Sequence, residues 1–250
     1  MNVLLVSAGR RVELLELLRA ACGGGSVVAV DTDPLAPALY RADAGEAVPR
    51  VEEAGFVERL LELCERYEIA LVAPTTDREL AILAEGVRTI SSRSQWTDPP
   101  ADDVWLVQPL IAAPEITLDV LAAEGGRIVS LGARRRLKVR GGEVERAVTV
   151  NGEPFVELAG AISTALDLSG PFNFQIFIQE DGPPLVGELN PRLGGGLPLS
   201  QHAGAMLLEA LCEWAATGAW PDGPPRLARA GAHMTRHDSS IFLEGGDLLW

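Results

Sequence analysis

Apolar runs and amphipathic segments alternate over the first third of the chain. Short, nearly continuous apolar runs predict buried strands at residues 2–7, 26–31 and 69–74. Apolar residues spaced three or four apart predict helices at residues 11–21, 56–67 and 77–84. Strands that alternate with helices favour a parallel sheet covered on both faces. We therefore predict a small Rossmann-like α/β unit at the start of the chain.

The second half of the chain has longer alternating segments. Residues 115–121 alternate apolar and polar side chains, and residues 127–132 follow them across the turn Glu124-Gly125-Gly126, which predicts a hairpin. A second hairpin is predicted from residues 172–179 and 185–189, and helices from residues 154–166 and 203–217. Antiparallel strands with helices on one side indicate an α+β domain.

A polar stretch separates the two patterns. Residues 91–103 contain Pro99-Pro100, so we predict a linker and a domain boundary there. This reading divides the chain into a first domain of residues 1–94, a linker of residues 95–104 and a second domain of residues 105–250.

The overall charge argues against binding to polyanions. Acidic residues outnumber basic ones by 35 to 21, which gives a formal net charge of −14, and such a surface repels nucleic acid. The basic residues cluster in residues 134–140, RRRLKVR. This strip suits a small anion, although a solvated strand face is an equally simple interpretation.

Cysteine usage and hydropathy favour a cytoplasmic protein. Cys22, Cys64 and Cys212 are far apart and odd in number, and no C-x-x-C pair is present, so neither a zinc site nor a disulfide framework is indicated. No signal peptide is recognisable, because Arg10 and Arg11 follow the first apolar run. No apolar run is long enough to span a bilayer, so we expect no membrane association.

Oxygen-bearing side chains gather in the second predicted hairpin. Glu188 and Asn190 lie two residues apart and so share a strand face, and the turn brings Gln175 beside them. Oxygen-only ligands of this kind suit Mg²⁺. Arg192 follows at the strand exit and can hold a phosphoryl oxygen, and Gly194-Gly195-Gly196 allows backbone amides to approach an anion. The alternative is a hairpin whose polar residues face water.

The same residues resemble a known family. Glu188-Leu189-Asn190-Pro191-Arg192, preceded by Asn173-Phe174-Gln175, resembles the metal-binding hairpin of ATP-grasp enzymes. Residues 3–11 and 31–38 resemble the opening of single-domain proteins similar to the carbamoyl-phosphate synthase large subunit, and residues 234–238 resemble their ending. The resemblance spans nearly the whole chain. It implies a Rossmann-like pre-ATP-grasp domain followed by a truncated α+β ATP-grasp domain.

The resemblance also implies site residues. Gln108, Pro109 and Leu110 lie where relatives hold adenine, although Pro109 removes one backbone donor. Glu115 lies where relatives bind the ribose, and Arg136, Lys138 and Arg140 lie on the strand that passes near the phosphates or substrate. The implied metal ligands for Mg²⁺ (or Mn²⁺) are Gln175, Glu188 and Asn190, and the implied catalytic phosphate contact is Arg192.

One part of the family pattern is missing. In relatives a lysine-bearing strand and a glycine-rich flap precede the adenine hinge, but residues 94–104 contain neither lysine nor glycine. Most of the nucleotide lid is therefore absent. We expect a second copy of the chain or a partner subunit to cover the flank that this absence leaves open.

Further residues are candidates for binding a small carboxylate substrate. Ser7, Asp31 and Asp77 end predicted strands or begin helices, where ligands collect in parallel sheets. Arg10 lies between a strand and a helix, where anions bind, and His202 follows the glycine loop. Turn, cap or surface roles are equally good interpretations of these residues. No G-x-G-x-x-G fingerprint is present, which argues against a nicotinamide cofactor.

Two functions are consistent with these observations. The first is an ATP- and Mg²⁺-dependent ligase that forms an acylphosphate and transfers the acyl group to an amine or a thiol. The second is a catalytically impaired ATP-grasp pseudoenzyme that acts as a nucleotide-binding or partner-binding module.

Overall fold

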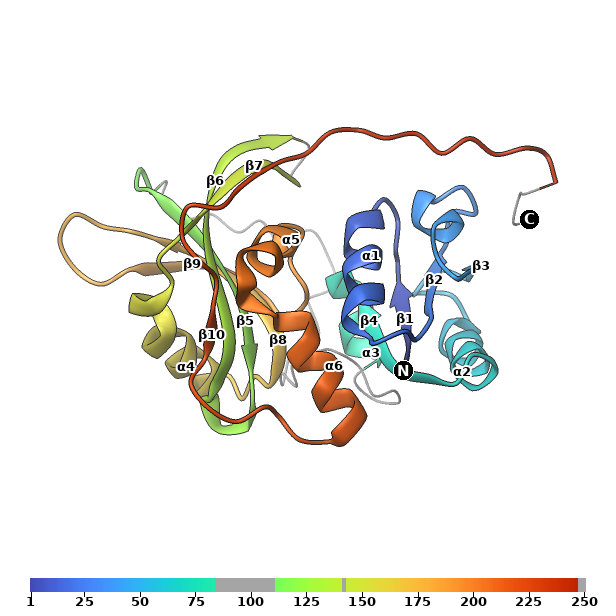
Figure 1. Cartoon of the computed structure of the whole chain (residues 1–250), viewed down its shortest axis with the longest axis horizontal. Coiled ribbons are helices and arrows are strands. Elements are labelled where there is room, and N and C mark those ends of the chain that lie inside the picture. Colours follow the sequence, from blue (N-terminus) through green and yellow to red (C-terminus); the bar gives the residue numbers. More distant parts are fainter. Residues whose placement is uncertain (84–110, 141–142, 247–250) are drawn as a thin grey trace.

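The computed structural model describes residues 1–83, 111–140 and 143–246, which fold around two β-sheets (Figure 1). The parallel sheet has the order β3-β2-β1-β4, and the larger sheet has the order β11-β7-β6-β5-β8-β9 with β10 paired to β6. In the described ranges no helix is long and apolar enough to cross a membrane. The predicted fold class, an α/β unit followed by an α+β unit, is confirmed.

The parallel sheet is covered on both faces by helices. Its strands are β1 (Asn2–Val6), β2 (Val27–Asp31), β3 (Ala44–Ala47) and β4 (Ile69–Pro74). Its helices are α1 (Val12–Ala21), α2 (Phe56–Arg66) and α3 (Asp77–Leu83), with a 3-10 turn, η1, at Pro37–Tyr40. Alternate residues of β1 point to opposite faces, so Val3 and Leu5 pack under α1 whereas Leu4 and Val6 pack under α2.

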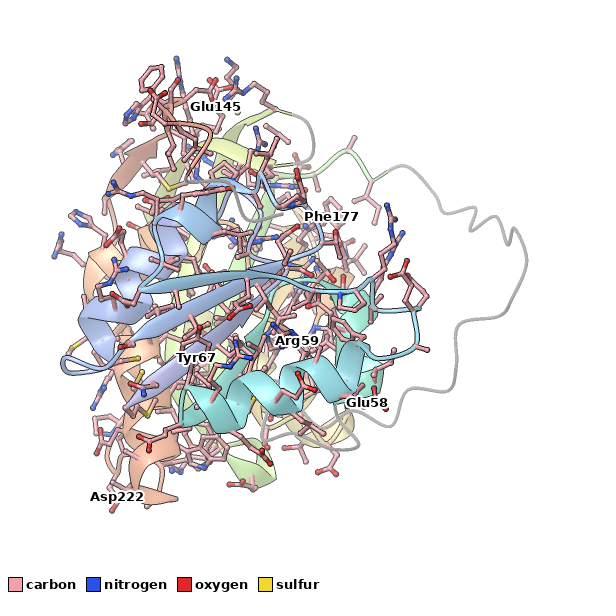
Figure 2. All side chains as sticks on the ribbon, turned by 90° about the vertical axis from the view of Figure 1, so that its right-hand side faces the viewer. Glu58, Arg59, Tyr67, Glu145, Phe177 and Asp222 are labelled. Atoms are coloured by element: carbon pink, nitrogen blue, oxygen red, sulfur yellow. The ribbon has the colours of Figure 1, made fainter. Side chains whose placement is uncertain are left out.

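The outer face of α2 is charged, as expected for an amphipathic helix (Figure 2). Glu58 is exposed, and Arg59 pairs with Glu46 of β3 at 2.8 Å. Strand β3 was not predicted, because its four residues, AGEA, show neither an apolar run nor a β-branched side chain.

The larger sheet is antiparallel along its ordered path. Its strands are β5 (Glu115–Ala122), β6 (Ile128–Arg140), β7 (Glu143–Val150), β8 (Gly170–Phe177), β9 (Leu185–Asn190), β10 (Arg226–Leu227) and β11 (His233–Thr235). Short β10 pairs with β6 in parallel. The basic run 134–140 is the continuation of the strand predicted at 127–132, and β7, its partner, was not predicted.

Helices flank this sheet and its connections. They are α4 (Val156–Ala165), α5 (Leu197–Ser200) and α6 (Leu207–Thr217), with 3-10 turns η2 (Glu124–Gly126) and η3 (Glu153–Phe155) and a π-helical segment η4 (Gln201–Ala205). The helix predicted from residue 203 begins only at Leu207. Gly204 and Met206 have positive φ values of 96° and 48°, which interrupt a right-handed helix.

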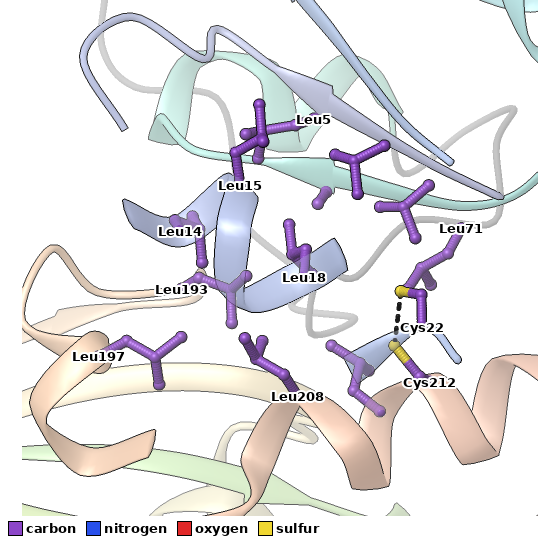
Figure 3. Close-up of a cluster of buried hydrophobic side chains, with 14 of the residues drawn as sticks. Leu5, Leu14, Leu15, Leu18, Cys22, Leu71, Leu193, Leu197, Leu208 and Cys212 are labelled. Carbon is purple, nitrogen blue, oxygen red and sulfur yellow. Dashed lines mark hydrogen bonds between the residues drawn. The ribbon is translucent and has the colours of Figure 1, made fainter. Parts of the chain in front are cut away.

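One apolar cluster joins the two sheets (Figure 3). Leu14 and Leu18 of α1 belong to the same buried cluster as Leu193, Leu208 and Leu211 of the second half. Each fully buried leucine contributes about 1.5–3 kcal/mol. The packing of α1 against α6 therefore holds the parallel sheet beside the larger sheet.

Candidate functional site

A cavity of about 220 Å³ lies over one face of the larger sheet. Two rows of residues, in register across β6, β5, β8 and β9, lie beneath it. The first row is Arg134, Thr117, Gln175 and Glu188, and the second is Gly132, Asp119, Asn173 and Asn190. Residues that alternate with these rows, such as Leu118 and Phe174, point to the other face and belong to the apolar cluster under α4. We call the two rows the polar floor.

The three predicted metal ligands lie together on the polar floor. Gln175 and Glu188 are directly opposite each other on β8 and β9, and Asn190 Nδ2 donates to Glu188 Oε1 at 3.0 Å. All three line the cavity. The sequence therefore predicted their convergence correctly, whereas their binding of a metal stays a prediction.

Asn173 is a floor residue that the sequence analysis did not select as a ligand. It lies opposite Asn190, accepts a hydrogen bond from that side chain at 3.4 Å, and donates to the backbone oxygen of Arg192 at 2.9 Å. Its spacing of two residues from Gln175 was the signal that places it on the same face.

The donor chemistry of the floor fits a hard divalent cation. Within the described ranges no group of three or more His, Cys, Asp and Glu side chains is placed to hold a metal, so the candidate set is one carboxylate and two amides. Thr117 Oγ1 adds an orphaned donor or acceptor: the residue is 2% exposed, lines the cavity, and its hydroxyl has no partner in the described part of the chain. Buried polar groups are normally satisfied, so the floor has capacity for a polar ligand.

A buried ion pair anchors the floor. Arg134 donates to Asp119 at 2.9 and 3.1 Å, and Ser200 of α5 donates to the same carboxylate at 2.6 Å. A side chain at Gly196 would overlap the Arg134 guanidinium, and one at Gly194 would press on Asp119 and Asn173. At these two positions glycine is required for packing against the floor, which is a different reason from the anion approach that the sequence suggested.

Three of the four remaining cations of the basic run are paired as well, whereas Arg135 is exposed. Arg136 contacts Glu115 at 2.6 Å, Lys138 contacts Glu145 at 2.8 Å, and Arg140 donates to Asp238 at 3.0 and 2.8 Å. The hydrogen bond from Lys138 lowers the pKa of Glu145, and the bond from Arg140 lowers that of Asp238.

These pairings bear on the predicted nucleotide-binding residues. Glu115 pairs with Arg136, and Lys138 and Arg140 are exposed toward the far end of β6. Arg140 lines the larger cavity described below, whereas Lys138 lines neither cavity. Gln108, Pro109 and Leu110 lie outside the described residues.

Arg192 and Asp77 connect the two sheets at the cavity. Arg192 Nε donates to Asp77 Oδ1 at 2.9 Å, and its Nη2 lies 3.3 Å from Asn190 Oδ1. Asp77 begins α3, whereas Arg192 follows β9. The predicted catalytic arginine is thus oriented by one predicted substrate residue and one predicted metal ligand.

Arg11 is a cation that the sequence analysis did not select. It precedes α1, lines both cavities, and donates to the backbone oxygen of Thr75 at 3.3 Å. Among the described residues no carboxylate lies within 4.0 Å of its guanidinium. Burial lowers its pKa, Arg192 and Arg236 lower it further, and the more distant carboxylates of Glu143 and Glu79 offset only part of this shift. Its position therefore favours an anionic ligand.

The turn after β1 fixes several of the predicted substrate residues. Asp31 accepts hydrogen bonds from the backbone amides of Gly9 at 2.8 Å and Asp33 at 2.9 Å, which is the turn role considered as its alternative. Ser7 has a left-handed φ of 51° and donates to Glu79. Glu79 is buried, burial raises its pKa, and its Oε2 has no hydrogen-bond partner in the described ranges.

A larger cavity of about 610 Å³ adjoins the first. Arg11, Glu143, Val144 and Gly195 line both cavities, so the two lie side by side. Arg10 lines the larger cavity with its side chain 77% exposed, whereas exposed His202 lines neither. Residues of the C-terminal segment, from Thr235 to Ile241, form the opposite wall.

Family models match both halves of the chain. A model described as "ATP-grasp in the biosynthetic pathway with Ter operon" matches residues 101–235, and a model described as "PylC-like, N-terminal domain" matches residues 3–93. A comparison with curated protein sequences found no match.

Solved structures share the fold at low sequence identity. A complete multifunctional pyruvate carboxylase from Rhizobium etli superposes with a TM-score of 0.67 and 14% identity over 93% of this chain, which spans 29% of the carboxylase. The biotin carboxylase domain of the Hydrogenobacter thermophilus 2-oxoglutarate carboxylase, in complex with MgADP and bicarbonate, has a TM-score of 0.63 and 12% sequence identity. This match covers 89% of this chain and 71% of that domain. Biotin carboxylase from Campylobacter jejuni has a TM-score of 0.61 and 13% sequence identity, over 88% of this chain and 72% of that one.

Proposed function

Because the chain belongs to the ATP-grasp family, we propose that it is an ATP- and Mg²⁺-dependent ligase that activates a small carboxylate as an acylphosphate. The observation that carries the proposal is the convergence of Gln175, Glu188 and Asn190 beside Arg192 at one cavity. MgADP bound to the Hydrogenobacter domain supports a nucleotide in this fold. The matches at residues 3–93 and 101–235 support domains of residues 1–94 and 105–250 joined by a linker at 95–104.

Gln175, Glu188 and Asn190 would hold the cation on the polar floor. A bound Mg²⁺ offsets negative charge on the nucleotide phosphates. Asn190 has a second task in this arrangement, because its side chain also accepts from Arg192. Hydrogen bonds to Asp77 and Asn190 hold the Arg192 guanidinium at the cavity wall. From there it can stabilise negative charge on a transferring phosphoryl group.

The proposed reaction has two steps. A carboxylate oxygen of the substrate attacks the γ-phosphorus of ATP, and ADP leaves. An amine nitrogen or a thiol sulfur then attacks the acyl carbon, phosphate leaves, and the nucleophile loses its proton. Arg11 stands at the junction of the two cavities, so it would bind the substrate carboxylate or the phosphoryl group that this carboxylate receives.

The remaining nucleotide and substrate contacts follow from the resemblance. Backbone groups of Gln108 to Leu110 would meet adenine, and Glu115 would bind the ribose after releasing Arg136. The substrate would lie in the larger cavity near Arg10, Arg11 and the Ser7 turn. His202 would contribute only through a rearrangement, since it lines neither cavity.

A pseudoenzyme is the second candidate, and a specific observation favours it. Residues 94–104 hold no lysine or glycine, and Lys138 and Arg140 are neutralised by Glu145 and Asp238. An open site screens charge and weakens electrostatic catalysis. A second copy or a partner subunit over this flank would close the site.

Calorimetry with ATP, in the presence and absence of Mg²⁺, tests the proposal on the full chain. We expect ATP binding that strengthens with Mg²⁺, and we expect Glu188→Gln to remove this increase. Glu180→Gln, in the exposed turn of the same hairpin, is the matched control and should behave as the wild type.

An assay of ADP release with panels of carboxylates and amines separates the two candidates. Release that requires a carboxylate supports the ligase, and Mg²⁺-dependent binding without release supports the pseudoenzyme. Absence of both ATP binding at millimolar concentration and ADP release contradicts the ligase and favours a partner-binding pseudoenzyme.

A further inference from the structure

Two buried cysteines meet where the two halves of the chain pack together. Cys22, at the C-terminal end of α1, and Cys212, in α6, are separated by 190 residues, yet their Sγ atoms lie 3.0 Å apart (Figure 3). Both residues are free thiols in the apolar cluster that joins the sheets, with exposures of 5% and 6%. The sequence spacing gave no sign of this pair.

We propose that Cys22 and Cys212 form a reversible disulfide that links α1 to α6. A disulfide requires sulfur atoms about 2.05 Å apart, so the two thiols need to approach by only about 1 Å. The packing of Leu18 and Leu208 in the same cluster fixes the helices that carry them. Closure therefore begins from two sulfur atoms that are already in contact.

The oxidant is a low-molecular-weight disulfide, such as oxidised glutathione. The Cys22 thiolate attacks one sulfur of the oxidant, and the first small thiolate leaves. Cys212, after losing its proton, attacks the Cys22 sulfur of the mixed disulfide, and the second small thiolate leaves. Two protein thiols are oxidised, the small disulfide is reduced to two thiols, and these accept both protons.

Cys22 is the better first nucleophile of the pair. The hydrogen bond with Cys212 lowers the pKa of Cys22, whereas that bond and burial raise the pKa of Cys212. Cys22 also lies at the C-terminal end of α1, where Gly23 and Gly24 lead the chain away from the helix with positive φ values of 62° and 89°. Local fraying of this helix end would admit a small disulfide.

Cys64 provides an internal comparison. It lies on α2, packed against the cluster on the opposite face of the parallel sheet, and burial raises its pKa. It is one of three cysteines in the chain, and it is remote from the cluster that holds the other two. Its replacement should leave the proposed reaction unchanged.

The disulfide should stabilise the chain and leave the cavities unaltered. It would close a loop of about 190 residues in the unfolded chain, and long loops give large stabilisation in the chain-entropy description. The ten residues of α1 extend over about 15 Å between Cys22 and the cavity residue Arg11. Oxidation therefore should not change ligand contacts.

The experiment incubates the native full chain with oxidised glutathione and compares it with the chain kept in dithiothreitol. We expect the total thiol count, measured after denaturation, to fall by two, the intact mass to fall by two hydrogens, and a Cys22–Cys212 peptide to appear in a non-reducing digest. The melting temperature should rise by about 5–10 °C and return on reduction. Cys64→Ser should reproduce all four results.

Cys22→Ala and Cys212→Ala should each lose the internal mass change and the thermal shift. Retention of all three thiols by the wild type would overturn the proposal, as would a stable glutathione adduct without an internal bond. A bridge that contains Cys64 would do the same. The Cys64→Ser result on the otherwise native chain keeps the test decisive if either alanine variant fails to fold.

Discussion

The two basic regions that border the cavities differ in how their charge is neutralised. On β6, the cations at positions 134, 136, 138 and 140 each have a carboxylate from another strand or from the C-terminal segment within 3.1 Å. At the start of α1, Arg11 has no carboxylate within 4.0 Å among the described residues, and two other arginines face it.

This difference shows that the number of cations in a segment is a poor measure of its affinity for anions. The carboxylates of neighbouring strands decide how much positive charge is left for a ligand, and their positions follow from the sheet register. Four of the five cations in the densest basic run are thus held in ion pairs, whereas Arg11 at the cavity has no carboxylate within 4.0 Å among the described residues.

The largest expected effect comes from breaking the buried pair. Asp119→Ala leaves Arg134 buried without a counter-charge, and we expect a loss of about 3–5 kcal/mol in the free energy of unfolding, measured with urea. Replacing both partners, Asp119→Leu with Arg134→Met, should recover most of this loss.

Lys138→Ala is the matched comparison, since it removes an exposed partner of the same strand. It should cost less than about 1 kcal/mol. If Asp119→Ala and Lys138→Ala cost the same, the ion pairs of β6 do not differ in the way that burial implies.

Gly196→Ala tests the close contact between the glycine loop and the floor. A methyl group there overlaps the Arg134 guanidinium, so we expect a loss of about 1–3 kcal/mol in unfolding free energy. Gly245→Ala, whose added carbon meets no atom within 4 Å, should change stability by less than about 0.5 kcal/mol. Equal stability of the two variants would mean that the loop packs loosely.

Arg11→Gln addresses the other side of the comparison. It removes the unpaired charge at the junction of the cavities, and we expect the affinity for MgATP, measured by calorimetry, to fall about tenfold. Arg10→Gln makes the same charge change one residue earlier, on a side chain that is 77% exposed, and should alter affinity less than about twofold. Equal losses would indicate a general electrostatic effect and no specific contact.

The smallest effect concerns Glu79, whose pKa is raised by burial. Between the ordinary glutamate pKa and the raised pKa, the folded chain keeps a proton that the unfolded chain releases. The stability that this group contributes is therefore fully present below the ordinary glutamate pKa. That stability is lost as pH rises through the raised pKa, at up to about 1.4 kcal/mol per pH unit.

Glu79→Gln should flatten this part of the stability profile, which urea unfolding between about pH 4 and pH 8 can measure. Glu58→Gln, on the exposed face of α2, should keep the wild-type slope. If Glu79→Gln and the wild type have the same slope in this range, Glu79 is ionised in the folded chain.

Local pattern sufficed to predict most of the elements and part of the site, although it missed β3 and β7. Leu4 and Val6 alternate with Val3 and Leu5 because the parallel sheet is covered on both sides, and this produces the continuous apolar run that was read as a strand. The hairpin turn and the period of two predicted that Gln175 would face Glu188.

Features that depend on distant pairing could not be predicted in this way. Arg11, Glu79 and the Cys22–Cys212 contact acquire their environment from segments far along the chain. The roles of Asp31 and Gly196 likewise became apparent only when their neighbours were known. Sequence reports which chemical groups are present, whereas tertiary packing decides which of them stay unpaired.

Strand β5 imposes a limit on how this protein can diversify. Its two faces have different roles. The odd-numbered residues Thr117 and Asp119 face the cavity side of the sheet, whereas the even-numbered residues Leu118 and Val120 pack in the apolar cluster beneath α4. Inserting or deleting one residue within β5 would exchange the two faces. The hydroxyl and the carboxylate would then point into the apolar cluster, and the leucine would point into the solvent-accessible cavity. In homologous sequences, insertions and deletions should therefore occur mainly in the turns between strands, while the strand lengths are conserved.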